Sequence, residues 1–430
     1  MTRIRRPVAP LLLATVSCCM AAMAPAAQAQ SAAPWFARAT VAMLHDTNYL
    51  RLADGAAAPA GYSKADTVVS GTLAAGFNQL FGAGQRAYAN AELRANRVLN
   101  NTLFDNQGWR AVAGLDWRTA GIVSGELRVL TDRGLAAFDT GTADVLGQAN
   151  LVTLSQADAV FRIGRNVGLN AETAFGWREV DYSAAFYDSR EFHEGSASAG
   201  LRYRPSDRSS IGVGVRGTRG SYPRYRDLGG GLFQADDYTG RFVDLTATYS
   251  VTGKSELRAR LSSGRTRHEN AVQSDFSGLT GSVDWRWRPT GKLAFTTTLT
   301  REPSQDAYFL ASAVGTVPLE FSRVSTALRV AADYALTERV RVRASVAGTH
   351  RELTQTLPAG TGGLIVLNGT DRTVVAGLGA SWQPGRLLTL GCDIGHEVRR
   401  GQPPLSADVT SSSLGCSLQV LLEGRRLEGR

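Results

Sequence analysis

The sequence has 430 residues, of which 43% are hydrophobic and 20% are charged, and its formal net charge at pH 7 is +9. This excess is mild and its arginines are spread singly, whereas nucleic-acid-binding proteins gather basic residues in a patch or along one helix. The composition therefore argues against a nucleic-acid partner. Only two of the four cysteines, Cys392 and Cys416, lie beyond the first 29 residues, and two are too few for a disulfide-built scaffold.

The first 29 residues have the three parts of a secretory signal peptide. Three arginines precede an apolar run from Leu11 to Met23, and Ala27-Gln28-Ala29 is a small-residue cleavage site, so we expect a mature chain that starts at Gln30. The apolar run is shorter than the about 18 residues that a spanning helix needs. We predict an exported protein whose net charge after cleavage is about +6, because three arginines leave with the leader.

After the leader, apolar and polar residues alternate with a period of two. STALRVAADY at 325–334 and RVRVRASVAG at 339–348 are examples, and both are rich in small and β-branched residues. Such alternation predicts β-strands that have one apolar and one polar face.

Short and long connections between these strands alternate along the chain. The predicted short turns are Gly82-Ala83-Gly84, Thr119-Ala120-Gly121, Gly164-Arg165-Asn166, Pro205-Ser206-Asp207, Thr252-Gly253-Lys254, Pro289-Thr290-Gly291, Leu336-Thr337-Glu338 and Gln383-Pro384-Gly385. The predicted long loops include 132–147, 219–238, 302–319 and 352–370.

Eight short turns and nine long connections give about 18 strands, with 16 as the alternative count. An even strand number with short turns at one end and long loops at the other is typical of bacterial outer-membrane barrels. The predicted fold is therefore all-β: a transmembrane antiparallel up-and-down β-barrel over residues 30–422, followed by a tail at 423–430.

An aromatic residue stands ahead of nearly every short turn, on the apolar phase of its strand. The predicted positions are Phe77, Trp117, Phe161, Tyr203, Tyr249, Trp285, Trp287, Tyr334 and Trp382. Aromatic rings at one end of a barrel form a girdle at the level of the lipid headgroups. A soluble β-sandwich would not place aromatics so regularly beside one class of turn.

The polar phase of the strands should face the barrel lumen. The candidate lumen-lining residues are Arg258, Arg260, Asp284, Arg286, Arg329, Arg339, Arg341 and Arg343. Two readings stay open: cross-strand partners that neutralise one another, or a surplus of arginine that favours anionic solutes. A barrel of 16 to 18 strands is wide enough for an aqueous channel.

Other motifs give no sign of an enzyme, a metal or a cofactor. Gly253-Lys254-Ser255 resembles the end of a phosphate-binding loop, but a strand follows it where that loop requires a helix. The five histidines lack metal-ligand spacing, and we expect His268 in a surface loop. Cys392 and Cys416 lie on the apolar phase of the last two predicted strands, either as a cross-strand disulfide or as two thiols.

The region from Asp244 to Arg301 resembles the EpsL-like outer-membrane barrels encoded with exopolysaccharide biosynthesis operons. Two Thr-Gly-Lys turns, Asp275-Phe276-Ser277-Gly278 and Trp285-Arg286-Trp287 carry the likeness, and the terminal cysteine hairpin is also similar. The resemblance is weaker over the first 200 residues. The ending LLEGRRLEGR departs from the aromatic final residue common in outer-membrane barrels.

The resemblance implies an outer-membrane component of a polysaccharide export system. We therefore expect a non-enzymatic barrel without cofactor that takes part in exopolysaccharide export, as a channel or part of one. Its expected partners are outer-membrane lipid, an acidic polysaccharide and other export components. The alternatives are a porin-like channel for small anions and a non-conducting structural barrel of the export machinery.

Overall fold

The computed structural model describes residues 33–82, 84–119, 121–136, 138, 148–165, 167–312, 315–358 and 364–424. The predicted signal peptide at 1–29 lies outside the described residues, as do residues 425–430 of the predicted tail. The first strand begins at Trp35 and the last ends at Glu423.

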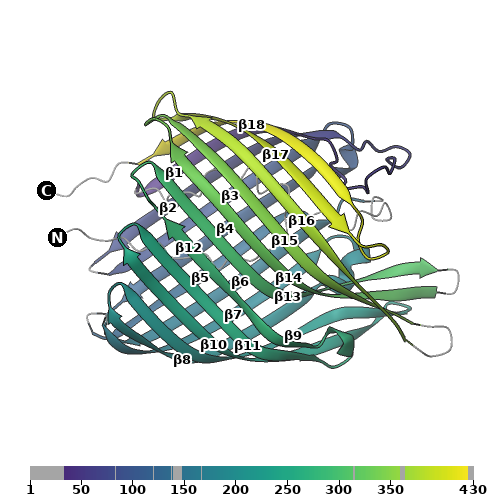
Figure 1. The fold of residues 1–430 in the computed structure, drawn as a ribbon, viewed down its shortest axis with the longest axis horizontal. Coiled ribbons are helices and arrows are strands. Elements are labelled where there is room, and N and C mark those ends of the chain that lie inside the picture. The colour runs from purple at the N-terminus through teal and green to yellow at the C-terminus, as the bar shows by residue number, and fades with distance from the viewer. Residues whose placement is uncertain are drawn as a thin grey trace.

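Eighteen antiparallel strands form one closed barrel, as predicted (Figure 1). The strands are β1 (Trp35–Asp46), β2 (Asp66–Phe81), β3 (Gln85–Val98), β4 (Asn106–Arg118), β5 (Val123–Leu135), β6 (Leu151–Gly164), β7 (Gly168–Tyr182), β8 (Phe192–Ser206), β9 (Ser209–Gly229), β10 (Leu232–Thr252), β11 (Ser255–His268), β12 (Phe276–Trp287), β13 (Leu293–Ser312), β14 (Gly315–Ala335), β15 (Val340–Pro358), β16 (Leu364–Trp382), β17 (Leu388–Gly401) and β18 (Val409–Glu423). Each strand pairs with the next in sequence, and β1 also pairs with β18. This last pairing leaves the sheet without an edge.

All eight predicted short turns join consecutive strands at the barrel end that also holds both chain ends (Figure 1). The other connections lie at the opposite end, which we call the mouth. Three short 3₁₀ segments occur there: η2 (Thr102–Phe104), η4 (Ala185–Arg190) and η5 (Val272–Ser274). No helix among the described residues is long and apolar enough to span a bilayer.

Three of the predicted long loops are strands instead. Segment 219–238 belongs to β9 and β10, 302–319 to β13 and β14, and most of 352–370 to β15 and β16. β9 passes into β10 through three consecutive glycines with positive φ, from Gly229 to Gly231, a conformation that glycine adopts without strain. The predicted loop 132–147 also starts too early, because β5 continues to Leu135.

The prediction failed there because the backbone pairing continues beyond the apolar belt of the barrel. A strand that meets water on both faces needs no apolar phase, so its residues no longer alternate. Polar composition was therefore read as a loop.

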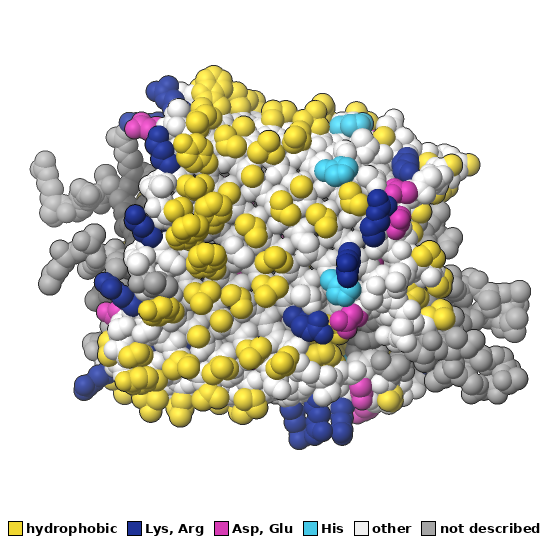
Figure 2. Space-filling model, in the orientation of Figure 1, with side chains coloured by type: hydrophobic (Ala, Val, Ile, Leu, Met, Phe, Trp, Pro, Cys, Tyr) yellow, Lys and Arg dark blue, Asp and Glu magenta, His cyan; other side chains and the backbone are white. Residues whose placement is uncertain are grey.

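The outer wall carries the apolar face of the strands. Figure 2 shows hydrophobic side chains in a broad belt across the visible face, with charged side chains toward both barrel ends. Leu73, Val215 and Ile394 are 64%, 61% and 54% exposed, respectively. A water-soluble protein would bury most such side chains in its core. A continuous ring of exposed apolar side chains instead fits a surface that contacts lipid tails.

The predicted aromatic residues lie on the outer wall next to the short turns. Tyr203 and Tyr249 are each 52% exposed and Trp382 is 49% exposed. Trp285 and Trp287 stack with ring centroids 5.7 Å apart, while Trp117 is half-buried and packs edge-on against Phe161 at 6.1 Å. The other predicted members, Phe77, Phe161 and Tyr334, are also exposed.

The two cysteines face each other across the last hairpin. Cys392 of β17 is the register partner of Cys416 of β18, with Cα atoms 4.1 Å apart, and the sulfurs form a disulfide. Of the two alternatives left open by the sequence, the structure has the disulfide.

Adjacent positions on β14 test which wall faces lipid. Leu328 is 47% exposed on the outer wall, whereas its neighbour Ala327 faces the lumen. We expect Leu328→Arg to lower the free energy of unfolding by about 2–4 kcal/mol, because it places a charge in the lipid core. The measurement is urea unfolding of the barrel in lipid vesicles. Ala327→Arg is the matched control and should cost far less; equal losses would contradict the assignment of faces.

Candidate functional site

The inner wall of strands β11 to β15 holds seven of the eight predicted lumen residues. They alternate along their strands with outward residues such as Leu261, Trp285, Leu328 and Val346, all of which are exposed on the outer wall. The inward residues are Arg258 and Arg260 on β11, Asp284 and Arg286 on β12, Arg329 on β14, and Arg341 and Arg343 on β15. The structure therefore brings these seven residues to one sector of the lumen.

The placement of Arg339 was wrong. Arg339 lies in the short turn before β15, where its backbone N–H donates to the Thr337 hydroxyl at 3.2 Å. The first sheet pairing of β15 is made by Val340 with Trp382. The alternation of the sequence continues into the turn, although the backbone has not yet entered the barrel wall.

Several arginines of this sector are neutralised by neighbouring carboxylates. Arg258 lies 2.6 Å from Glu256, Arg343 2.8 Å from Asp333, and Arg260 3.6 Å from Glu302. Thr298 also donates its hydroxyl to Asp284 at 2.9 Å. Arg343–Asp333 and Arg260–Glu302 join different strands and so are the cross-strand partners expected from the sequence, whereas Arg258 and Glu256 both lie on β11.

The rest of the inner wall is held by similar cross-strand ion pairs. Examples are Arg38–Glu92 at 2.6 Å, Arg94–Asp132 at 2.6 Å, Arg162–Glu126 at 2.5 Å, Arg162–Glu172 at 2.7 Å and Arg216–Asp244 at 3.0 Å. Arg38 and Glu92 lie on strands that are not adjacent, with β2 between them. Such contacts tie the wall together and cancel most of its charge.

Arg286, Arg329 and Arg341 are different, because none of them forms an ion pair within the described part of the chain. In the register, Arg286 is opposite Thr296 of β13 and Glu256 of β11, but the ion pair of Glu256 is formed with Arg258. Arg329 is opposite Thr298. Arg341 is opposite Ala335. These three arginines are here called the free arginine set. Among the described residues of this sector they outnumber the one inward carboxylate without an ion pair, Asp284, which accepts a hydrogen bond from Thr298. A channel wall that carries excess positive charge, next to protein of low dielectric constant, raises the local concentration of anions.

The mouth of the lumen is crossed by the connection between β7 and β8. Its η4 segment contacts β13, which lies five strands beyond β8 in the sheet. Arg224 of β9 holds this connection through Asp188 at 2.9 Å and Glu191 at 3.4 Å. Burial raises the pKa of Glu191 above its ordinary value. The segment from Ser183 to Glu191 therefore narrows the entrance.

A second fastening at the mouth joins β10 to β11. His268 was expected in a surface loop, but it is the last residue of β11 and is buried. Its Nδ1 lies 2.7 Å from Asp236, which also accepts backbone hydrogen bonds from Asn270 and Ala271. Burial alone would raise the pKa of Asp236, but these hydrogen bonds outweigh it and hold the pKa below its ordinary value.

The connection between β1 and β2 is fixed by contacts that the sequence did not reveal. Arg51 lies 2.9 Å from Asp46 and 3.1 Å from Glu397 of β17, and all three are buried. Leu50 and Leu52 pack with Phe104 in a small apolar core. Glu397 is 346 positions from Arg51 in sequence, so only closure of the barrel brings them together.

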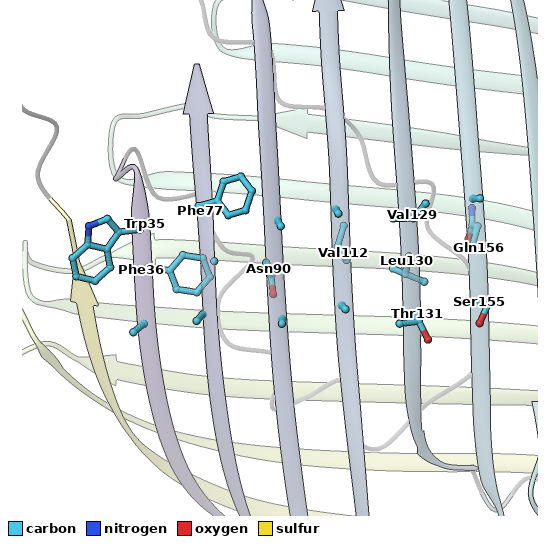
Figure 3. Close-up of a pocket in the computed structure, with 18 of the residues that line it drawn as sticks. Trp35, Phe36, Phe77, Asn90, Val112, Val129, Leu130, Thr131, Ser155 and Gln156 are labelled. Atoms are coloured by element: carbon cyan, nitrogen blue, oxygen red, sulfur yellow. The ribbon is translucent and has the colours of Figure 1, made fainter. Parts of the chain in front are cut away.

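The described residues contain no cluster of His, Cys, Asp or Glu arranged to hold a metal ion. A depression of about 800 Å³ lies on the outer wall between β1 and β7. Trp35, Phe77, Val129 and Trp177 line it with alanines between them, and Figure 3 shows Trp35 and Phe77 on the first two strands. Its outward lining is apolar except for Thr131 and Ser155, so it belongs to the lipid-facing surface and not to the lumen.

Solved structures with a similar fold are outer-membrane barrels. The chain aligns with the outer membrane protein OpdK of Pseudomonas aeruginosa at 16% identity and a TM-score of 0.46, over 90% of this chain and 99% of that one. It aligns with the ferric enterobactin receptor PfeA of the same organism at 7% identity and a TM-score of 0.41, over 90% and 80%.

The FrpB iron transporter of Neisseria meningitidis aligns at 9% identity and a TM-score of 0.42, over 94% of this chain and 82% of that one. Similarity at this level concerns the barrel fold and says nothing about what passes through this lumen. No protein-family model matches the chain, and no curated protein matches it.

Shortening the β7–β8 connection tests whether it narrows the entrance. We expect replacement of residues 185–190 by two glycines to raise the single-channel conductance in planar bilayers, because the segment that crosses to β13 is removed. The same replacement of residues 55–60, which are largely exposed, is the control and should leave conductance unchanged. Equal conductance of wild type and both variants would contradict a constriction at η4.

Proposed function

We propose that this protein is an outer-membrane barrel that takes part in the export of an acidic exopolysaccharide, as the channel or a component of it. The observation that carries the proposal is the free arginine set, Arg286, Arg329 and Arg341, on the inner wall. The belt of exposed apolar side chains supports insertion in a membrane, and the resemblance of the region from Asp244 to Arg301 to EpsL-like barrels supports the link to polysaccharide.

The lumen has features suited to an anionic polymer. Conduction needs sites that attract the solute but release it again. In a water-filled lumen, the attraction between one arginine and one carboxylate 4 Å apart is about 1 kcal/mol at the dielectric constant of bulk water. A carboxylated chain in the lumen would therefore pass from one arginine to the next without being held strongly by any of them.

A channel for small anions is the second candidate. The crossing of η4 to β13 favours it, because a narrowed mouth admits a small solute more readily than a polymer. The two candidates share the arginine set and differ in what is lost when the gene is removed.

The test is secretion of polysaccharide by the bacterium that encodes this chain. We expect deletion of the gene to abolish secreted polymer and complementation with the wild-type gene to restore it. Complementation with R286E/R329E/R341E should restore much less, because the wall then repels an acidic polymer. Secreted and cell-retained polysaccharide are measured in each strain.

The matched control is R165E/R208E/R386E, which makes the same charge change at three exposed arginines that lie in short turns between strands. This variant should restore secretion fully. Unchanged secretion in the deletion strain would overturn the export proposal and leave the small-anion channel. Equal complementation by both triple variants would overturn the role of the free arginine set.

A further inference from the structure

Four exposed arginines stand together on the outer wall at the mouth side of β9, β10 and β11. They are Arg219, Arg241, Arg265 and Arg267, and we call them the outer arginine cluster. Their side chains share the outward face with the apolar residues that lie closer to the short turns on the same strands. Val215 is 61% exposed, Val243 53% and Leu261 50%. The cluster thus sits where the apolar belt ends.

The register places these charges close together. Arg241 is directly opposite Arg265, and Thr239 is opposite both Arg219 and Arg267. Directly opposite residues have Cβ atoms about 4.5–5.5 Å apart, and like charges in that position destabilise a sheet. A bound anion would remove this repulsion.

No member of the outer arginine cluster forms an ion pair with another described residue. Other outward arginines at the mouth differ in this respect. Arg400 lies 3.0 Å from Asp408 and Arg301 lies 3.8 Å from Glu352. Arg133 stacks over Trp109, with its guanidinium carbon 5.0 Å from the ring centre. Arg400, Arg301 and Arg133 thus have partners, whereas none of the four arginines of the cluster has an ion-pair partner among the described residues.

A depression of about 940 Å³ adjoins Arg241 and Arg265. Its outward lining includes the apolar or small residues Phe175, Ala197, Ala199, Val215, Gly217 and Val243, with the hydroxyl residues Thr173, Ser263 and Ser277 beside them.

Glycine contacts on the two faces of the wall show where the free space lies. A Cβ added at inward Gly264 would clash with Phe242 at 2.5 Å, whereas one at outward Gly217 would meet nothing within 4 Å. On the inner face Arg216 also covers the Phe242 ring, at 4.3 Å from its centre. The empty space is therefore on the lipid-facing side.

We propose that the outer arginine cluster binds the phosphate groups of a phosphorylated glycolipid in the leaflet at the mouth, and that an acyl chain of this lipid occupies the depression. Planar guanidinium groups bind phosphate oxygens in pairs, and basic residues at a membrane surface attract anionic headgroups. The site lies outside the lumen, so this proposal does not depend on conduction or on the cargo.

The geometry favours a membrane lipid over a free anion. The arginines and the apolar depression are contiguous on one outward surface, which matches a molecule with a phosphate head and a hydrocarbon tail. A soluble phosphate ion would contact only the arginines and would not need the depression.

Binding is tested with the full mature barrel, delipidated in mild detergent and examined by native mass spectrometry. The probes are diphosphoryl lipid A and the same lipid without its phosphates. We expect wild type to retain the diphosphorylated form at least about tenfold more tightly, since several surface arginines together attract the phosphate groups. R241E/R265E should lose that preference.

Two further variants separate charge, shape and folding. R372E/R400E changes another directly opposite pair on the outer wall, at β16 and β17, and should bind lipid A like wild type. Gly217→Phe fills the depression at a position with open space, and it should weaken binding although all four arginines remain. Heat-modifiable migration in gels confirms that each variant is a folded barrel.

Three results would overturn the proposal. The first is equal retention of the phosphorylated and dephosphorylated lipids by wild type. The second is an equal loss in R241E/R265E and R372E/R400E, which would indicate general attraction to the surface. The third is unchanged binding by Gly217→Phe together with binding of inorganic phosphate alone at the same arginines, which would indicate a free-anion site.

Discussion

Closure of the sheet between β1 and β18 is the constraint on which the rest of the structure depends. In an apolar medium every backbone N–H and C=O must find a partner within the protein, and a closed barrel satisfies this for all of its strands. The register from Phe36–Glu423 to Asp46–Ser413 closes the last gap. Closure also brings Arg51 to Glu397 of β17.

Once the sheet is closed, each residue of a strand belongs either to the lipid side or to the lumen side. The lumen side contains many arginines and carboxylates, and most of its described arginines are neutralised across strands, as Arg162 is by Glu126 and Glu172. The sector from β12 to β15 brings together three arginines that form no ion pair with a described residue. Elsewhere on the inner wall Arg128 and Arg178 also lack an ion pair, but Arg128 is opposite Asp158 and Arg178 lies over the Phe192 ring.

The alternation of residues and the aromatic positions were sufficient to predict the strand number, the turn end and the face of residues such as Trp285 and Arg286. Three kinds of feature were out of reach. Strands beyond the apolar belt look like loops because both faces are wetted. Ion pairs such as Arg38–Glu92 depend on register across an intervening strand. The outer arginine cluster was overlooked because arginines were assigned to the lumen, although Arg241 and Arg265 stand in phase with outward Val243 and Leu261.

The measurement that tests the account most directly is the ion selectivity of the purified wild-type barrel in a planar bilayer under a potassium chloride gradient. Unpaired Arg286, Arg329 and Arg341 on the lumen wall predict a conducting pore whose reversal potential lies toward that of chloride. A cation-selective pore, or a folded barrel that inserts and carries no current, would contradict the central claim that this lumen is a path for anions.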